Sequence, residues 1–315
     1  MIVVTAVDIE LAVLVLAVAA WTIAARQAFP AVVGYVAYGL LLSLVWVRLY
    51  AVDVALTEAA IGSGVTGVVL IGAATRLRGT EAEAAAEQPR AFLRLAAAAL
   101  CVGMTVALAA AVLLMPDPAP TLAPEAVAHL PSTGLGNAVT AVLLAYRVVD
   151  TMFESVVLLL ALVGVWSLAP DRDWGGAPKF PRPAGQDGVL TFFAQLLPPV
   201  GIVVGIHIVW IGADEPGGKF QGGTILAAMW IIAMTAGLVD APQISRCWLR
   251  LVLVAGTAAF LVIGVAGFAW AAGFLAYPEG YAKPLILVIE AFMTLSVAAT
   301  LGMLVGGPPQ QELRR

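Results

Sequence analysis

AVDVALTEAAIGSGVTGVVLIGAATR, residues 51–76, is the stretch that decides the fold. It is long and apolar enough to cross a bilayer, because a spanning helix needs about 20 apolar residues. It nevertheless contains Asp53 and Glu58. An aspartate at the centre of a membrane helix costs roughly 2.5–3.5 kcal/mol, so a carboxylate at that depth is rarely kept without a role. We therefore expect this helix to belong to an ion path.

The rest of the chain has the same apolar character. Of its 315 residues, 62% are hydrophobic and 11% are charged, whereas about 25% are charged in a soluble domain. Runs of this kind predict helices, because unpaired backbone groups are not tolerated in lipid. The predicted fold class is an all-α polytopic membrane protein with about nine transmembrane helices, at residues 3–25, 30–50, 52–75, 91–115, 139–168, 189–211, 223–240, 248–275 and 284–306.

The basic residues predict the orientation of these helices. Alternating spans place 12 of the 16 Lys and Arg residues on one side, which the positive-inside rule makes cytoplasmic. The N-terminus is then outside and the C-terminus is cytoplasmic. The first segment has no positive region before its apolar run and carries Asp8 and Glu10. It therefore predicts a membrane helix and not a cleaved signal peptide.

Two polar segments, residues 76–94 and 169–188, divide the spans into groups of three, two and four. The second is rich in Pro and Gly without apolar periodicity, which is typical of a linker. Residues 116–138 form a Pro-rich segment that we expect to be an outer loop on the membrane surface. The chain shows no internal repeat, so an inverted-repeat transporter gains no support.

Asp53 and Glu58 are the first candidate site residues. They are five positions apart, about 140° around an α-helix, so they do not share a face. Asp53 is predicted near the outer end, as an interfacial cap or as part of an ion entrance. Glu58 lies deeper, either as a carboxylate that relays protons or as an acid paired with a neighbouring helix for assembly. Gly62, Gly64 and Gly67 permit close packing or local unwinding around it.

The fifth span supplies a second group of charges, Arg147, Asp150 and Glu154. Their spacing of i, i+3 and i+7 puts all three on one helix face. Arg147 can pair with Asp150, which leaves Glu154 as the isolated carboxylate and the better candidate for an ion-carrying group. The alternative for the pair is a salt bridge that fixes the helix at the outer membrane surface.

His207 and Glu290 are the remaining candidates inside apolar spans. His207 is either a hydrogen-bonded core residue or a proton relay, since histidine titrates near neutral pH. Glu290 is another intramembrane acid. Lys283 precedes it by seven residues, about 10 Å along the axis, which is too far for a tight pair.

A glycine-rich loop joins the sixth and seventh spans. Its glycines after a proline permit a sharp, closely packed turn, and it lacks Walker spacing. We predict a structural or subunit-contact role for Pro216, Gly217, Gly218, Phe220, Gly222 and Gly223.

Nothing in the sequence indicates covalent catalysis. We find no Ser/His/Asp or Cys/His arrangement, no nucleotide or iron–sulfur motif, and no basic patch for nucleic acid. Cys101 and Cys247 have neither CxxC spacing nor nearby histidines, which argues against a metal site. We expect a non-enzymatic chain without a metal or cofactor.

Three blocks resemble the small membrane subunits of Mrp-type multisubunit Na+/H+ antiporters and membrane-bound hydrogenases. DVALTEAAIGSG, residues 53–64, looks like the signature helix of the hydrogenase protein MbhD, which also occurs near the C-terminus of the large Mrp antiporter protein MrpA. YRVVDTMFE, residues 146–154, looks like the hydrogenase protein MbhE. EPGGKFQGG, residues 215–223, with the four spans of 189–306, is similar to the antiporter protein MnhB or MrpB.

The resemblance implies a fusion of these three families in that order. Its parts are an MbhD-like domain at 1–78, an MbhE-like domain at 79–170, a linker at 171–188 and an MnhB-like domain at 189–307. The MnhB family usually has a His-Asn step before Pro-Gly-Gly, where this chain has Ala213, Asp214 and Glu215. Lys219 also replaces a usual glycine. These departures put the role of the missing histidine in doubt.

By resemblance, the chain is one subunit of a Na+/H+ antiporter in a prokaryotic inner (cytoplasmic) membrane. Its partners would be large antiporter-like and small helical subunits, with Na+, H+ and lipid. Residues on or near the ion path would be Glu58, Glu154, Asp53, Asp150, Arg147, Thr57, His207 and Glu290. The alternatives are a subunit of a redox-driven relative, such as a hydrogenase or ferredoxin-linked complex, and a purely structural scaffold.

Overall fold

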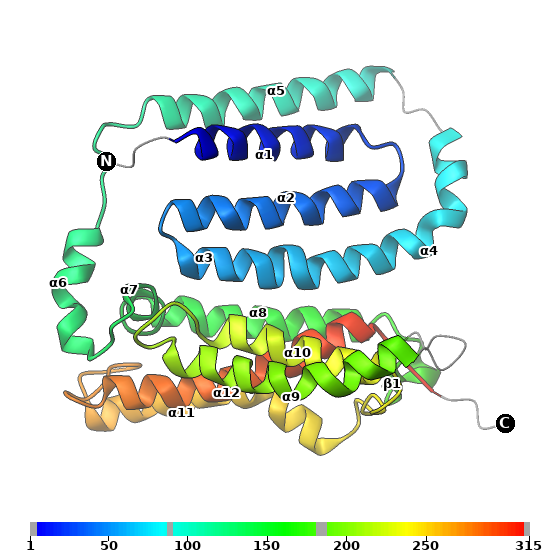
Figure 1. Cartoon of the computed structure of the whole chain (residues 1–315). Helices are drawn as coiled ribbons and strands as arrows, with labels where there is room; N and C mark the ends of the chain where they lie inside the picture. The colour runs from blue at the N-terminus through cyan, green and yellow to red at the C-terminus, as the bar shows by residue number, and fades with distance from the viewer. Residues whose placement is uncertain (1–4, 87–90, 181–187, 312–315) are drawn as a thin grey trace.

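The computed structural model describes residues 5–86, 91–180 and 188–311, and nearly all of it is helical (Figure 1). The elements in chain order are α1 Ala6–Ala24, α2 Ala28–Arg48, α3 Val52–Thr57, the π-helix η1 Glu58–Val65, α4 Thr66–Ala86, α5 Ala91–Leu113, α6 Ala123–Thr133, α7 Ala138–Ala141, the π-helix η2 Val142–Tyr146, α8 Val148–Trp166, the 3-10 turn η3 Asp171–Asp173, β1 Ala177–Pro178, α9 Gly188–Ile211, α10 Lys219–Thr235, α11 Cys247–Trp270, α12 Ala282–Gly306 and β2 Pro309–Gln310.

The helices confirm an all-α polytopic membrane protein. In the part of the chain that the structure describes, eight helices are long and apolar enough to cross a bilayer. A ninth is added if α6 and the α7–η2 segment, bent by 87°, count as one span. The predicted seventh span at 223–240 corresponds to α10, which begins four residues earlier and has only 17 residues. The side of the membrane on which each terminus lies stays a prediction.

The N-terminal helices form a row. α1 packs against α2, and α2 packs against the continuous α3–η1–α4 span (Figure 1). An ion pair of 2.7 Å between Arg48 and Asp8 joins α2 to the start of α1. η1 is the local unwinding that the glycines of this stretch predict. Tyr35 on α2 donates a hydrogen bond of 3.2 Å to the carbonyl of Gly62 within it.

The C-terminal helices form a bundle around α12. Its apolar side chains include Ile286, Ile289 and Met293, which are fully buried and pack with Phe260 of α11 in one core cluster. Such burial stabilises the fold by roughly 1.5–3 kcal/mol for each large apolar side chain. This bundle gives fixed positions to the few polar groups that it encloses.

Three predicted segments differ from the structure. The expected outer loop at 116–138 contains the helix α6, and its cap residue Gly134 is left-handed with φ 68°. The polar joint predicted from residue 76 begins inside α4, which continues to Ala86. Within the predicted linker at 169–188, β1 pairs antiparallel with β2 through Ala177 and Gln310.

The fifth span is broken where a single helix was predicted. The expected helix at 139–168 is divided into α7, η2 and α8, with Arg147 between them at φ −123° and ψ 37°. The hydroxyl of Thr151 donates to the carbonyl of Leu143 at 2.6 Å and satisfies an acceptor at the break. The prediction missed the break because the chain before Arg147 is apolar on every side, so there is no apolar periodicity that a shifted turn would interrupt.

The helix α5 stands apart from both groups. No residue of α5 is buried, and Figure 1 shows it beyond α1, far from the C-terminal bundle. An apolar helix with no buried face within its own chain needs lipid or partner helices to cover it.

The close approach of α9 and α10 predicts a strong response to a single methyl group. A Cβ on Gly222 would stand 2.7 Å from the carbonyl oxygen of Gly205 and would also meet the Val209 side chain. Gly222→Ala should therefore destabilise the assembled complex by about 1–3 kcal/mol. This loss would be seen as a lower thermal unfolding midpoint. Gly164→Ala is the matched control, because nothing within 4 Å surrounds its Cβ position. Equal midpoints for the two variants would contradict the packing.

Candidate functional site

Asp53 anchors the α3 helix to the glycine-rich loop between α9 and α10. Its half-buried carboxylate accepts a hydrogen bond of 3.0 Å from the Gly217 N–H. It also accepts from the side-chain amide of Asn137, with both oxygens at 3.4 Å. Gln221 of α10 donates to the Asp53 carbonyl at 3.3 Å and to the Thr57 hydroxyl at 2.9 Å. Asp53 thus contacts residues from two other parts of the chain.

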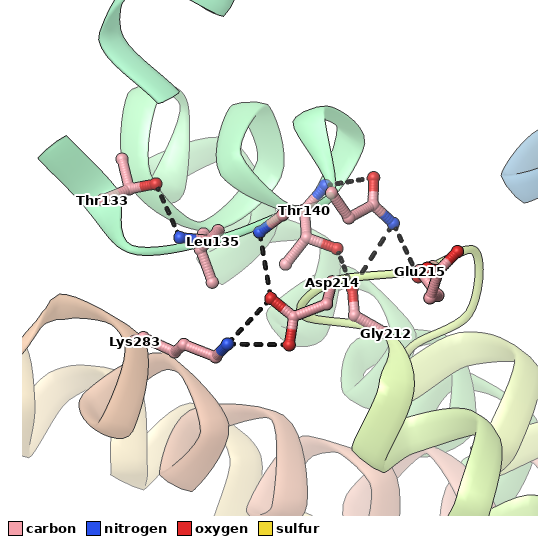
Figure 2. Close-up of polar contacts among 9 residues, drawn as sticks. Thr133, Leu135, Thr140, Gly212, Asp214, Glu215 and Lys283 are labelled. Carbon is pink, nitrogen blue, oxygen red and sulfur yellow. Dashed lines mark hydrogen bonds and ion pairs between the residues drawn. The ribbon is translucent and has the colours of Figure 1, made fainter. Parts of the chain in front are cut away.

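Asn137 is the centre of this junction. Its Oδ1 caps α7 by accepting from the Val139 N–H at 2.8 Å, while its Nδ2 donates to the carbonyls of Gly212, at 3.3 Å, and Glu215, at 3.0 Å. The Thr140 hydroxyl donates to the same Gly212 carbonyl at 2.6 Å (Figure 2). An irregular loop enclosed by apolar helices needs partners for its carbonyl groups, and these two side chains supply them.

Asp214 connects the same loop to α12. Lys283 donates to both carboxylate oxygens at 2.7 Å, and the Gly136 N–H donates at 3.1 Å (Figure 2). These hydrogen bonds, the one from Lys283 above all, hold the pKa of Asp214 below its ordinary value. The predicted separation of Lys283 from Glu290 is therefore correct, since Lys283 pairs with a loop residue.

Two glycines of the loop adopt conformations that other residues rarely take. Gly217 has φ 155° and Gly218 has φ 129°, and a Cβ on Gly212 would stand 2.7 Å from the Gly218 Cα. The Gly218 N–H then donates to the Ile208 carbonyl of α9 at 3.1 Å. The loop, which contains Pro216, is thus folded tightly back onto the end of α9. Phe220, Gly222 and Gly223 follow it in α10.

Glu58 lies at the first position of η1 and faces α2. Its carboxylate is folded toward Gly62, and a Cβ on Gly39 of α2 would stand 2.7 Å from Glu58 Oε1. The hydroxyl of Ser63 meets the same Gly39 position, and it is buried without a hydrogen-bond partner among the described residues. The close approach of Glu58 and Ser63 to α2 therefore depends on Gly39 and Gly62, because a side chain at either position would meet the Glu58 carboxylate.

The charges of the fifth span divide as their spacing predicts. Arg147 and Asp150 form an ion pair of 2.6 Å, with side chains 72% and 53% exposed, which confirms their pairing. An exposed pair of this kind contributes about 0–1 kcal/mol to stability. Glu154, one turn further along α8, is exposed and has no direct partner among the described residues.

Glu290 and Lys219 are buried side by side in the C-terminal bundle. Each is 2% exposed. Glu290 lies against the start of α10, because a Cβ on Gly218 would stand 3.2 Å from its Oε1. Glu290 Oε2 has no hydrogen-bond partner among the described residues. Lys219 and Glu290 are thus two buried charged residues on the neighbouring helices α10 and α12.

Of the predicted site residues, Asp53 and Thr57 meet at Gln221. Glu290 lies against Gly218 at the start of α10, and Glu154 is exposed on α8. Glu58 faces α2 and is not paired with either group. His207 lies on the exposed face of α9, so its interpretation as a buried core residue is wrong, and its relay role stays a prediction. In the described ranges, no three His, Cys, Asp or Glu side chains gather as a metal site would require.

Sequence reasoning missed Asn137, Gln221 and the burial of Lys219. Asn137 had a usable signal, because Asn before an apolar run is typical of a helix N-cap. Its second role, as a donor to Asp53 and the loop, depends on segments more than 70 positions away. Lys219 was noted only as an unusual residue among glycines.

Comparisons with known families match two parts of the chain. Residues 13–79 match the MbhD family of MBH proteins, and residues 189–307 match the family described as a domain related to the MnhB subunit of Na+/H+ antiporter. An uncharacterized protein of Methanocaldococcus jannaschii is 27% identical over 146 residues, which are 42% of this chain and 56% of that protein.

Two solved complexes contain similar chains. In the structure of the Mrp complex from Dietzia sp. DQ12-45-1b, one chain is 25% identical and matches 99% of this chain with a TM-score of 0.75. This chain spans only 36% of that longer one. In the membrane-bound sulfane sulfur reductase, an archaeal respiratory membrane complex, a whole chain matches 70% of this one at 24% identity with a TM-score of 0.56. The similarity to this reductase chain shows a shared fold and no more.

The Asn137 junction predicts the outcome of exchanging the side chains of Asn137 and Asp53. Asn137→Asp keeps the acceptor that caps α7 but removes the Nδ2 donor and sets a carboxylate against Asp53. We expect a loss of about 2 kcal/mol in the thermal stability of the complex. The double variant Asp53→Asn with Asn137→Asp restores one donor and one acceptor, and it should recover part of that loss. A double variant that loses the sum of the two single effects would show that the residues do not interact.

The Asp214–Lys283 pair predicts a pH dependence. Because the pKa of Asp214 is lowered in the folded state, its contribution to stability is complete above the ordinary aspartate pKa, about 3.9, and is lost as the pH falls through the lower folded value. The thermal unfolding midpoint of the Asp214→Asn complex should therefore lie slightly below that of the unmodified complex at pH 7. In acid the two midpoints should become equal. Glu279→Gln, in the loop before α12, is the control, and a difference that widens in acid would contradict the assignment.

Proposed function

We propose that this chain, a membrane subunit of the Mrp and MBH type, contributes carboxylates to the ion path of an Mrp-type cation/proton antiporter. The observation that carries the proposal is Glu58, an acid in a π-turn of an apolar span, beside a buried hydroxyl without a partner among the described residues. A carboxylate kept at this depth is costly unless it serves a path. The likeness to a chain of the Mrp complex supports the choice of complex.

Each candidate has a distinct part in the proposal. Glu58 and Glu154 are the path carboxylates. Asp53, Thr57, Asp150 and Arg147 hold or tune their surroundings, Glu290 is an inner acid, and His207 relays protons at the face of α9. Na+ is the proposed cation, exchanged for H+.

The proposed setting follows from the same resemblance. We infer that the chain is multi-pass in a prokaryotic inner membrane, with its N-terminus outside and its C-terminus in the cytoplasm. Residues 79–170 are proposed to be an MbhE-like unit between the MbhD-like and MnhB-like units. The unburied helix α5 supports contact with other membrane subunits, both antiporter-like and small helical ones.

A redox-driven complex is the second candidate function. The fold likeness to a chain of a respiratory membrane complex favours it, and the same acids would then couple ion movement to electron transfer. Purification of the native complex separates the two candidates. Iron–sulfur absorption and a hydrogenase-like or reductase-like partner would indicate the redox complex, whereas antiporter subunits alone would indicate the exchanger.

Neutralising the path acids tests the ion-path proposal. Purified complexes with Glu58→Gln or Glu154→Gln should lose at least about tenfold in Na+/H+ exchange across vesicle membranes, because a positioned proton-transfer group typically contributes about 10²–10⁴-fold to a rate. Glu125→Gln is the matched control, since that acid lies exposed on α6. Full exchange in both intact variants would leave only the scaffold interpretation.

A further inference from the structure

A cavity of about 270 Å³ opens where the N-terminal row of helices meets the C-terminal bundle. Its walls come from three segments that are far apart in the sequence, namely α4, the stretch after β1, and the end of α12 with β2. Figure 1 shows the second half of α4 and β1 at the same end of the molecule. The cavity is lined by Arg76, Lys179, Phe180, Gly306, Pro308 and Gln310. Two of these residues are cationic and none is acidic.

Backbone pairing and close packing hold the wall that follows β1. Pro178 of β1 pairs with Pro309 of β2, so Lys179 comes directly after a paired strand. A Cβ on Gly306 would stand 2.9 Å from ring atoms of Phe180, and the ring therefore packs on the bare end of α12. The basic and aromatic groups of this wall are thus placed by the fold.

The two cations of the cavity have no anion from the protein. Arg76 and Lys179 are exposed, and neither forms an ion pair or a side-chain hydrogen bond within the described residues. Asp173, the acid nearest to Lys179 in sequence, instead accepts from the Gln311 N–H at 3.4 Å and lies 3.9 Å from the Arg172 guanidinium. An anion in the cavity would be attracted by both cations. Arginine binds phosphate with paired N–H groups, and lysine binds it as a point charge.

The cavity lies at the level where two apolar spans end. The helices Val52–Leu77 and Ala282–Gly306 are each long and apolar enough to cross a bilayer. Arg76 comes one residue before the end of the first, and Gly306 is the last residue of the second. Because lipid headgroups begin where the apolar part of a span ends, the cavity is level with lipid phosphates. The Phe180 ring adds an apolar wall, which suits the glycerol and upper acyl chains of a lipid and offers nothing to a free phosphate ion.

We propose that this cavity binds the phosphate headgroup of an anionic phospholipid through Arg76 and Lys179. Both residues belong to the side that the positive-inside rule makes cytoplasmic, and basic pockets between membrane helices on that side bind anionic headgroups. The lipid joins α4 to the β1–β2 pair and so helps to hold the N-terminal row on the C-terminal bundle. The site does not depend on the ion path, and it serves an antiporter and a redox-driven complex equally.

The test measures lipid binding to the purified, assembled complex in a neutral detergent. A short-chain phosphatidylglycerol is titrated while the thermal unfolding midpoint is recorded, because a ligand that binds the folded state raises its stability as the site fills. We expect the double variant Arg76→Gln with Lys179→Gln to raise the half-saturating lipid concentration at least about tenfold, since each basic residue near an anionic lipid strengthens binding.

The matched control is the double variant Arg172→Gln with Arg246→Gln. It removes the same charge from exposed residues of the same predicted side, but neither residue lines the cavity. Its half-saturating concentration should stay close to that of the unmodified complex. Short-chain phosphatidylcholine, which has no net charge, should raise the midpoint much less. Inorganic phosphate at constant ionic strength, which has no glycerol or acyl chains, should also raise it much less.

Several results would overturn the proposal. An unchanged half-saturating concentration in Arg76→Gln with Lys179→Gln contradicts it, and so does an equal shift in the control variant. An equal effect of phosphatidylcholine would remove the role of charge, and an equal effect of inorganic phosphate would assign the cavity to a free anion. Loss of another subunit from the variant complex, with no lipid response in the unmodified complex, would assign the cavity to an acidic protein segment.

Conservative and single variants keep the test decisive if the double glutamine variant does not assemble. Arg76→Lys with Lys179→Arg keeps both charges and should retain the lipid response, and loss of that response contradicts the proposal. Arg76→Gln and Lys179→Gln are then titrated singly, and each should raise the half-saturating concentration. Unchanged values in both single variants overturn the proposal.

Discussion

The side-chain amide of Asn137 is the interaction on which the arrangement of the three predicted units depends. It caps α7 and donates to the loop carbonyls, and it also faces the carboxylate of Asp53. A loop that folds back among apolar helices leaves backbone carbonyls that neither lipid nor helix can satisfy. One amide with donors and an acceptor meets several of these needs at once, and so it fixes α3, α7 and the start of α10 relative to one another.

The π-helix η1 shows the same constraint within a single span. A π-turn disturbs the regular hydrogen-bond ladder and is frequently found at functional sites. Here the Tyr35 hydroxyl donates to the Gly62 carbonyl, and Thr66 donates to the Ile61 carbonyl at 2.8 Å. The widened turn also directs Glu58 toward the bare surface of Gly39 on α2. The glycines thus serve two purposes, since they permit the unwinding and leave room for the carboxylate.

Periodicity predicted much of the fold because membrane helices follow composition closely. The spans, the unwinding near Gly62 and the pairing of Arg147 with Asp150 are local properties of the sequence. The burial of Lys219, the donors of Asn137 and the exposure of His207 are not local. They arise from which helix faces meet, and an apolar helix without amphipathic pattern carries no signal of its inward face. Sequence reasoning therefore found the acids but not the groups that surround them.

The surroundings of the acids also show which contacts connect α3 with α12. One route passes an apolar cluster in which Val65 and Leu158 pack against Ala227 and its neighbours, and such side chains offer no ligand to an ion. The other route passes Gln221. Its amide donates to Thr57, which adjoins Glu58 in the chain, while its Oε1 and the Glu290 Oε1 both approach the Cβ position of Gly218, at 3.6 and 3.2 Å. Buried polar groups need polar neighbours, so Gln221 and Gly218, and not the apolar cluster, are where polar atoms of α3 and α12 approach each other.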